Sequence, residues 1–227
     1  MKSQEESPDL PVVTADGSHT LFHTVLKEHY HSLQGSLQES EHIYIGLGLL
    51  PKTETPGDET IEVFEMGFGT GLNALLTWKT ADRLRRPVRY TGIEAYPVGD
   101  EQSALLNYEA LAGKGGLEIL HSVSWGERHT LSPWFSFCKI NAFLEEYAAE
   151  GAQYDVVYFD AFSPGTQPEL WTTGVFARVA RLMKQGGYLV TYSSKGSVRR
   201  ALKEAGFRVE KHPGPGIKRE VIRAVKE

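Results

Sequence analysis

The sequence predicts an α/β protein of the doubly wound, Rossmann-like type, with a mostly parallel seven-stranded sheet, helices on both faces and a small N-terminal β appendage. Strand-like and helix-like stretches alternate from residue 61 onward. A glycine-rich loop separates the first such strand from the first helix. With 227 residues, 41% of them hydrophobic, the chain is long enough to bury one large core.

The first 60 residues are expected to form the appendage and a linker. VVTADGSHTLF places Asp16-Gly17 between two strand-like arms, which indicates a type I′ β-hairpin. The run EHYHS then gives way to the apolar IYIGLGLL, and KTETPGDET is typical of a linker. We therefore predict an N-terminal part, residues 1–60, and a main domain, residues 61–227.

The main domain is expected to continue the alternation to the end of the chain. Its parallel strands are predicted at 61–67, 88–94, 135–140, 154–161 and 187–193. Its helices are predicted at 72–85, 100–113, 142–150 and 197–207, with another that ends at 184–187, and the stretch around Trp125 and Trp134 is less regular. A last strand pair, 208–212 and 219–225, fits the methyltransferase variant of this fold, in which the last strand is antiparallel.

The glycine loop, EMGFGTGLN, indicates the ligand. Gly67, Gly69 and Gly71 follow a strand and precede a helix, at the edge where open α/β sheets bind ligands. A dinucleotide fingerprint needs a further glycine where Leu72 stands, so the G-x-G-x-G pattern favours S-adenosylmethionine, which has no phosphate. A carboxylate such as Glu65 can attract the ammonium group of its amino acid portion.

Glu94 is the second acidic candidate. It ends the next strand, 27 positions after Gly67, so one β-α-β unit returns the chain beside the glycine loop. A carboxylate at this place can accept hydrogen bonds from both ribose hydroxyls.

The segment YFDAFSPGTQPELW carries the candidate chemistry. Asp160 ends the fourth core strand and is followed by Phe162 and Pro164. Amino-group methyltransferases of this fold place a short acidic or amide residue, a proline and an aromatic here. An acceptor such as the Asp160 carboxylate can hold the hydrogens of an amine, aim its lone pair and help to deprotonate it.

The amino-acid composition limits the ligands and partners that we expect for this chain. The single cysteine, Cys138, excludes an internal disulfide and a thiolate zinc cluster, and no metal is expected. The chain has neither a long apolar run nor a leader-like start, which predicts a cytoplasmic protein without a membrane segment. From Lys195 onward the sequence has ten Lys and Arg and four Glu, so this C-terminal tail carries a charge of +6, whereas the whole chain carries −5. Such a basic tail can bind phosphates or can simply be a solvated surface.

Three segments together resemble a known family. GFGTGLN, DAFSPGTQPELWT and the late VRRALKEAGFRVEKHPGPGIKREVIRA are similar to the methyltransferase (MnmD-type) domain of the tRNA 5-methylaminomethyl-2-thiouridine biosynthesis protein MnmC, from about residue 14 to the end. This resemblance implies a class I S-adenosylmethionine-dependent methyltransferase. Its implied reaction is methylation of the amine of 5-aminomethyl-2-thiouridine at the wobble position of tRNA.

The resemblance also implies roles for particular residues. The cofactor would be held by the glycine loop, with Tyr30 beside it and Asn141 where relatives place an acidic residue, although Asn141 can equally be a helix cap. Asp160, Phe162 and Pro164 would face the amine. The implied cofactor loop consists of Glu65, Gly67, Gly69, Thr70, Gly71 and Asn73, with Glu94 at the ribose. The implied contacts with the uridine and tRNA are His31, Lys195, Arg199, Arg200, Lys203, Lys218 and Arg219.

The resemblance implies that bifunctional members of the family carry a C-terminal FAD-dependent oxidase domain, whereas this sequence resembles the methyltransferase domain alone. We therefore expect a stand-alone methyltransferase with a functional link to the enzymes that install the aminomethyl group.

Other functions fit part of the pattern. A small-amine methyltransferase or an aminopropyl transferase would keep the glycine loop, Glu94 and Asp160, but would leave the basic tail unexplained. A uridine carbon-5 methyltransferase needs a nucleophilic cysteine, whereas Cys138 lies inside a predicted strand. A non-catalytic tRNA or cofactor-binding module remains an alternative, which substitution of Asp160 would distinguish.

Overall fold

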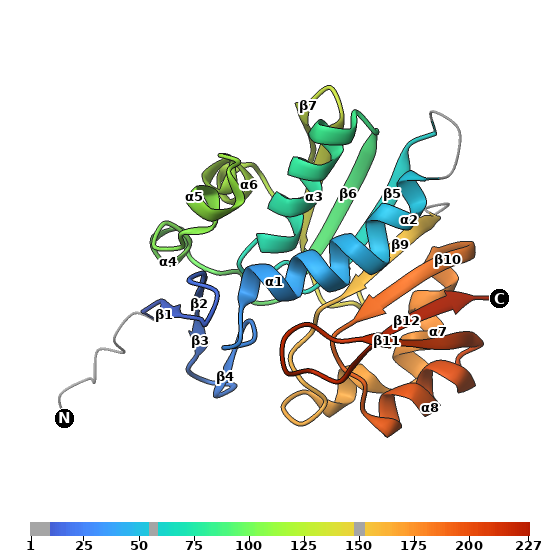
Figure 1. The fold of residues 1–227 in the computed structure, drawn as a ribbon. Helices are drawn as coiled ribbons and strands as arrows, with labels where there is room; N and C mark the ends of the chain where they lie inside the picture. Colours follow the sequence, from blue (N-terminus) through green and yellow to red (C-terminus); the bar gives the residue numbers. More distant parts are fainter. Residues whose placement is uncertain (1–9, 55–58, 148–152) are drawn as a thin grey trace.

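The computed structural model describes residues 10–54, 59–147 and 153–227, and contains one large sheet with helices on both faces (Figure 1). The strand order is β11-β12-β10-β9-β5-β6-β8-β7. The strands are β5 (Ile61–Met66), β6 (Val88–Glu94), β7 (Arg128–Ser132), β8 (Phe135–Asn141), β9 (Tyr154–Phe159), β10 (Met183–Thr191), β11 (Phe207–Pro213) and β12 (Glu220–Lys226).

The five predicted parallel strands are confirmed. β10, β9, β5, β6 and β8 pair in parallel, and β12 lies antiparallel between β10 and β11. The prediction of seven strands was wrong by one, because β7 adds an antiparallel edge strand to β8. This strand comes from the less regular stretch around Trp125 and Trp134, and its alternation of exposed and half-buried side chains gives only a weak strand signal.

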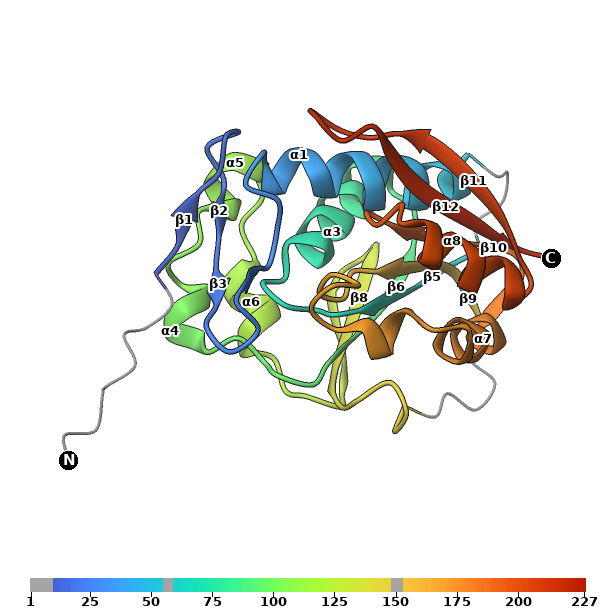
Figure 2. The same cartoon turned by 90° about the horizontal axis from the view of Figure 1, so that it is seen from below.

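The central strands bury both faces, as expected for a sheet covered on two sides. In β9, Val156 and Tyr158 join one buried cluster and Val157 and Phe159 join the other. The first cluster is covered by α3 (Leu72–Leu84) and the second by α7 (Thr173–Leu182) and α8 (Gly196–Glu204) (Figure 2).

A long helix precedes the first core strand, where the sequence analysis expected only a hairpin and a linker. It consists of α1 (Ser36–Ser40), the π-helical η1 (Glu41–Leu49) and α2 (Leu50–Thr53), and it crosses the sheet over β9 and β10 (Figure 1). Tyr44 and Leu49 are buried in the first cluster. A Cβ at Gly48 would lie 3.0 Å from the Val190 side chain, so glycine permits the close approach. The core therefore extends ahead of residue 61.

The N-terminal β appendage forms two small hairpins. β1 (Val12–Val13) pairs with β2 (His19–Thr20), and β3 (Phe22–His23) pairs with β4 (Glu28–His29). The turn of the first hairpin contains Asp16-Gly17 as predicted, but only Gly17 has a positive φ, 82°, so the turn is not type I′. Asp16 instead accepts hydrogen bonds from the side chains of Thr14 and Ser18.

Three predicted helices differ in the structure. The stretch 100–113 is divided into α4 (Asp100–Ser103) and α5 (Tyr108–Ala112), because the Asn107 side chain between them binds the first hairpin through the His19 amide and the Gly17 carbonyl. The described part of 142–150 is a turn rather than a helix, and residues 148–150 lie outside the described residues. The helix predicted to end at 184–187 ends at Leu182, because Met183 already pairs with Tyr154.

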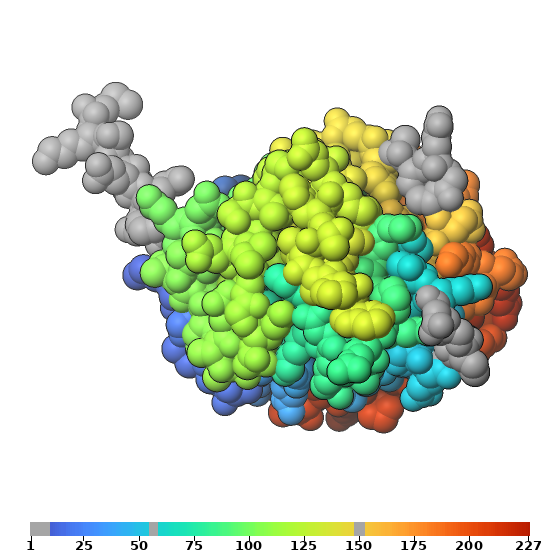
Figure 3. Space-filling model, turned by 90° about the horizontal axis from the view of Figure 1, so that it is seen from above, coloured from blue at the N-terminus to red at the C-terminus, as the bar shows by residue number. Residues whose placement is uncertain are grey.

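The two ends of the molecule are formed by different helices and strands. The N-terminal hairpins lie against α4, α5 and α6 (Leu117–Ser122) at one end, and β11 and β12 form the other (Figure 2). Figure 3 shows α4–α6 in green adjoining the yellow-green β7 on one face. Within the described ranges, no helix has the length and apolar character needed to cross a membrane.

Candidate active site

The glycine loop after β5 is shaped by its immediate neighbours. Gly67, Gly69 and Gly71 have φ values of 90°, 49° and 79°, which favour glycine. A Cβ at Gly67 would lie 2.7 Å from the Asp160 carbonyl oxygen, and one at Gly69 would lie 3.1 Å from the Tyr30 ring. The loop is therefore confined between the Asp160 segment and the N-terminal appendage, and side chains at these positions would displace both.

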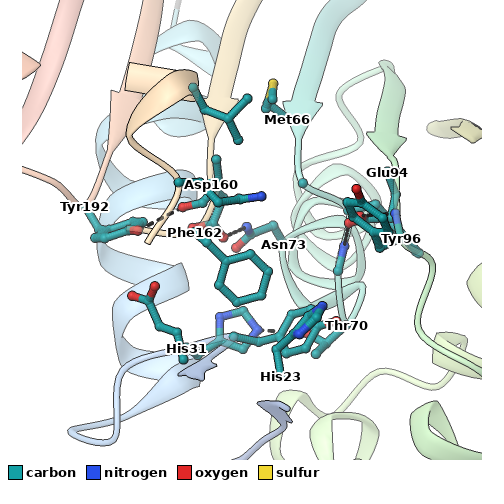
Figure 4. Close-up of a pocket in the computed structure, with 18 of the residues that line it drawn as sticks. His23, His31, Met66, Thr70, Asn73, Glu94, Tyr96, Asp160, Phe162 and Tyr192 are labelled. Atoms are coloured by element: carbon teal, nitrogen blue, oxygen red, sulfur yellow. Dashed lines mark hydrogen bonds between the residues drawn. The ribbon is translucent and has the colours of Figure 1, made fainter. Parts of the chain in front are cut away.

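A cavity of about 670 Å³ opens beside this loop, at the carboxyl edge of the parallel strands. Its volume lies in the range of ordinary small-molecule sites. Figure 4 shows Phe162 near the centre of the view, with Asp160 and Asn73 above its ring and Glu94 on the right. The predicted residues that line it are Tyr30, His31, Gly67, Gly69, Thr70, Asn73, Glu94, Asp160, Phe162 and Lys218.

Glu94 occupies the cavity wall at the end of β6. Its Oε2 accepts a hydrogen bond from the Gly69 amide at 2.9 Å, and its Oε1 accepts one from the Tyr96 amide at 2.9 Å. Burial raises the pKa of this carboxyl, while the backbone amides partly offset the effect. The carboxylate thus fixes the glycine loop and still faces the cavity.

Asp160 is held by two side chains. Its Oδ1 accepts a hydrogen bond from the Tyr44 hydroxyl at 2.5 Å, and its Oδ2 accepts one from the Asn73 amide at 2.8 Å. Burial raises the pKa of Asp160 to about 7, although both hydrogen bonds act in the opposite direction. A carboxyl with this pKa exchanges protons readily near neutral pH.

Asn73 connects the two strand ends, because its amide also donates to Glu65 Oε1 at 2.9 Å. Glu65 itself does not line the cavity: it is buried behind the loop, and burial raises its pKa well above the usual value. The structure therefore places Glu65 beneath the loop as a support for Asn73. The buried Asn73 Oδ1 has no hydrogen-bond partner among the described residues, which leaves an acceptor at the cavity wall.

Aromatic rings close the cavity on the side of the appendage. The Tyr30 and Phe162 rings meet edge to face at 5.1 Å, and the His23 and Phe162 rings do so at 5.3 Å. His31 lies deeper, where its Nε2 is 2.7 Å from Thr70 Oγ1, and burial lowers its pKa to about 4, so its imidazole is neutral at pH 7. His31 thus contacts the glycine loop as well as the cavity.

The predicted cations separate into three groups. Lys218 reaches the cavity and forms an ion pair with the buried Glu39. Lys195 and Arg219, together with Pro164, line a second hollow beside the cavity. Arg199, Arg200 and Lys203 lie on α8 and line neither space.

Two other candidates lie away from the cavity. The Asn141 amide donates to the Glu94 carbonyl at 2.8 Å, so it joins the ends of β6 and β8 and does not line the cavity. Cys138 is buried within β8, where burial raises the pKa of its thiol, so it is not an activated nucleophile. No cluster of possible metal ligands occurs in the described part of the chain.

Several lining or supporting residues were missed by the sequence analysis. Tyr44 binds Asp160 from 116 positions away, and the Glu28 carboxylate accepts a hydrogen bond from the Ser163 amide at 3.1 Å. The Tyr192 hydroxyl donates to the Ala161 carbonyl at 2.8 Å. No local motif marks these residues, because each contact joins segments that are distant in the sequence.

Comparisons with known proteins show what the chain as a whole is similar to. Residues 118–227 match a family described as S-adenosyl-L-methionine-dependent methyltransferase. The chain is 32% identical to the tRNA 5-methylaminomethyl-2-thiouridine biosynthesis bifunctional protein MnmC of Ralstonia nicotianae, over 95% of this chain and 33% of that protein. The MnmC of Cupriavidus metallidurans is 33% identical over 94% of this chain and 33% of that protein. The crystal structure of MNMC2 from Aquifex aeolicus has a TM-score of 0.75 and 28% identity, and the match covers 97% of this chain and 71% of that one.

The fold, the cavity and these matches define the chain as an S-adenosyl-L-methionine-dependent methyltransferase. It is homologous to the MnmC proteins and spans about a third of the length of the curated relatives that it matches. The cavity residues fit the cofactor: Glu94 offers carboxylate oxygens to hydroxyl groups, and Asn73 Oδ1 is a free acceptor for an ammonium group.

Proposed function

We propose that this chain methylates the side-chain amine of 5-aminomethyl-2-thiouridine at the wobble position of tRNA, giving 5-methylaminomethyl-2-thiouridine. The observation that carries the proposal is the Asp160 carboxyl, which is held at the cavity wall by Tyr44 and Asn73 and has a pKa of about 7. Its position beside the glycine loop puts a proton acceptor within the same cavity as the expected methyl donor.

An aliphatic amine is mostly protonated at neutral pH and must lose a proton before its lone pair can attack. Ionised Asp160 accepts this proton and holds the remaining N–H groups, while Tyr44 and Asn73 fix the direction of the carboxylate. When bound, S-adenosylmethionine supplies an electrophilic methyl group; the new N–C bond forms as the methyl–sulfur bond breaks, and its electron pair remains on sulfur. The Phe162 and Tyr30 rings offer apolar surfaces to the uracil ring.

The remaining candidates support this arrangement. Glu94 would accept hydrogen bonds from the ribose of the cofactor, and Thr70 would be positioned by His31 at the turn of the loop. The exposed cations at Lys195, Arg200 and Arg219 would contact tRNA phosphates. We also propose that the enzymes that install the aminomethyl group deliver its substrate.

The test is mass spectrometry of nucleosides from tRNA that carries 5-aminomethyl-2-thiouridine, after incubation with the protein and S-adenosylmethionine. We expect conversion to the methylaminomethyl nucleoside, and a loss of at least about a hundredfold in the Asp160→Asn variant. Equal activity on small amines would indicate a small-molecule methyltransferase. Full turnover in the Asp160→Asn variant would contradict the role of this carboxyl.

A further inference from the structure

The second hollow lies next to the cavity and is built from three loops. It has a volume of about 530 Å³. Ser163 and Pro164 come from the segment after Asp160, Ser193 and Lys195 from the loop between β10 and α8, and Arg219 from the turn between β11 and β12. Tyr192 and Lys218 line both this hollow and the cavity, so the two spaces adjoin.

The charge of this hollow is positive and partly unpaired. Lys218 is neutralised by Glu39, and the lining residue Glu220 is paired with Lys211. Lys195 and Arg219 form no ion pair with any described residue. Two cations thus remain available to an anion.

The polar groups converge on one place. A Cβ at Gly165 would lie 3.5 Å from Lys195 Nζ and 3.6 Å from Ser163 Oγ, so the ammonium and the hydroxyl both reach the turn that follows Pro164. Ser193 is 6% exposed and lines the same hollow, and α8 begins directly after Lys195. A phosphate here would meet cationic and hydroxyl donors together.

We propose that this second hollow binds the backbone phosphate next to the uridine whose base enters the cavity. The inference rests on the proposed function, because it requires an RNA acceptor. A base and its own phosphate are separated by a single ribose, which suits two adjoining spaces that share Tyr192 and Lys218. The hollow therefore makes no contact that depends on the identity of a base. Its role is to position the nucleotide so that the amine on the uridine side chain lies next to Asp160.

Equilibrium binding of an anticodon stem-loop RNA at several salt concentrations tests the proposal without relying on methylation. We expect the Lys195→Gln/Arg219→Gln double variant to bind at least about tenfold more weakly, with the slope of log affinity against log salt reduced by about 0.7 for the one phosphate that is no longer neutralised. The matched control is Arg83→Gln/Arg181→Gln, which removes the same number of positive charges from exposed positions outside the hollow. Equal losses in the two double variants would overturn the proposal.

A second experiment tests the effect of the phosphate without the rest of the RNA. The free nucleoside 5-aminomethyl-2-thiouridine is compared with its 5′- and 3′-monophosphates as methyl acceptors. We expect one of the two phosphates to lower KM about tenfold in the wild-type protein and in the control, and neither to do so in Lys195→Gln/Arg219→Gln. An advantage that survives in this double variant would overturn the proposal. If the wild-type protein methylates none of these acceptors or the tRNA, the proposed function fails, and the binding arm still decides whether the hollow holds a phosphate.

Discussion

Removal of the Tyr44 hydroxyl should shift the pH dependence of methyl transfer. This hydroxyl donates to Asp160 at 2.5 Å and lowers the pKa of a carboxyl that burial has raised to about 7. A hydrogen bond to a charged acceptor contributes about 1.5–3 kcal/mol, and about 1.4 kcal/mol corresponds to one pKa unit. The Tyr44→Phe variant should therefore have an Asp160 pKa of about 8–9.

The loss of activity depends on the ionised fraction of Asp160. At pH 7 this fraction falls from about one half to between roughly one tenth and one hundredth, so turnover should fall about 5- to 50-fold. At higher pH Asp160 ionises again, and most of the activity should return. The pKa of the substrate amine is the same for both proteins, so the difference between their profiles reports on the enzyme.

The assay is single-turnover methyl transfer from pH 6 to pH 10, with Tyr158→Phe as the control. Tyr158 is also fully buried, its ring lies 5.3 Å from that of Tyr44, and its hydroxyl lies 3.2 Å from Thr77 Oγ1 rather than Asp160. The control should have the midpoint of the wild-type profile. A Tyr44→Phe profile with an unchanged midpoint would refute the reasoning.

Three other substitutions give separate tests. Asp160 has a native pKa of about 7 against the ordinary 3.8, so its ionisation costs stability as pH rises from about 4 to 7. Asp160→Asn loses one of the two hydrogen-bond acceptors but does not ionise, so the difference in free energy of unfolding between variant and wild type should move in favour of the variant by up to roughly 4 kcal/mol between pH 4 and pH 8, as measured by urea unfolding. Gly67→Ala should weaken S-adenosylmethionine binding at least about tenfold in calorimetry, because the added Cβ would clash with the Asp160 carbonyl oxygen. The control is Gly186→Ala, which has a φ of 73° and no atom within 4 Å of the added Cβ; it should cost only about 1 kcal/mol of stability. Asn141→Ala should change cofactor affinity by less than about threefold, since its amide binds backbone carbonyls; a loss of tenfold or more would restore the adenine contact expected from the sequence.

The sequence was most informative where a local pattern decides the structure. The glycine loop, β5, β6 and α3 were predicted nearly to the residue, because each has a clear periodicity or a glycine or proline boundary. The carboxyl edge of parallel strands then brings Glu94 and Asp160 to one cavity.

The rest depends on contacts between distant segments. Tyr44 lies in a helix that precedes the sheet, and its apolar neighbours gave no sign that it would reach Asp160. Much of the basic tail proved to be paired within the sheet and with α1, as in Arg223 with Glu210 and Lys218 with Glu39. A count of charges cannot distinguish these paired cations from Lys195 and Arg219.

The most direct test of the central claim uses S-adenosylmethionine labelled with deuterium in its methyl group and tRNA that carries 5-aminomethyl-2-thiouridine. Fragmentation of the isolated nucleosides in the mass spectrometer locates the label. The account predicts a labelled methyl group on the side-chain nitrogen of the wobble uridine, formed at least about a hundredfold more slowly by the Asp160→Asn variant. Label on the uracil ring or on another nucleoside, or a fully active Asp160→Asn variant, would contradict it.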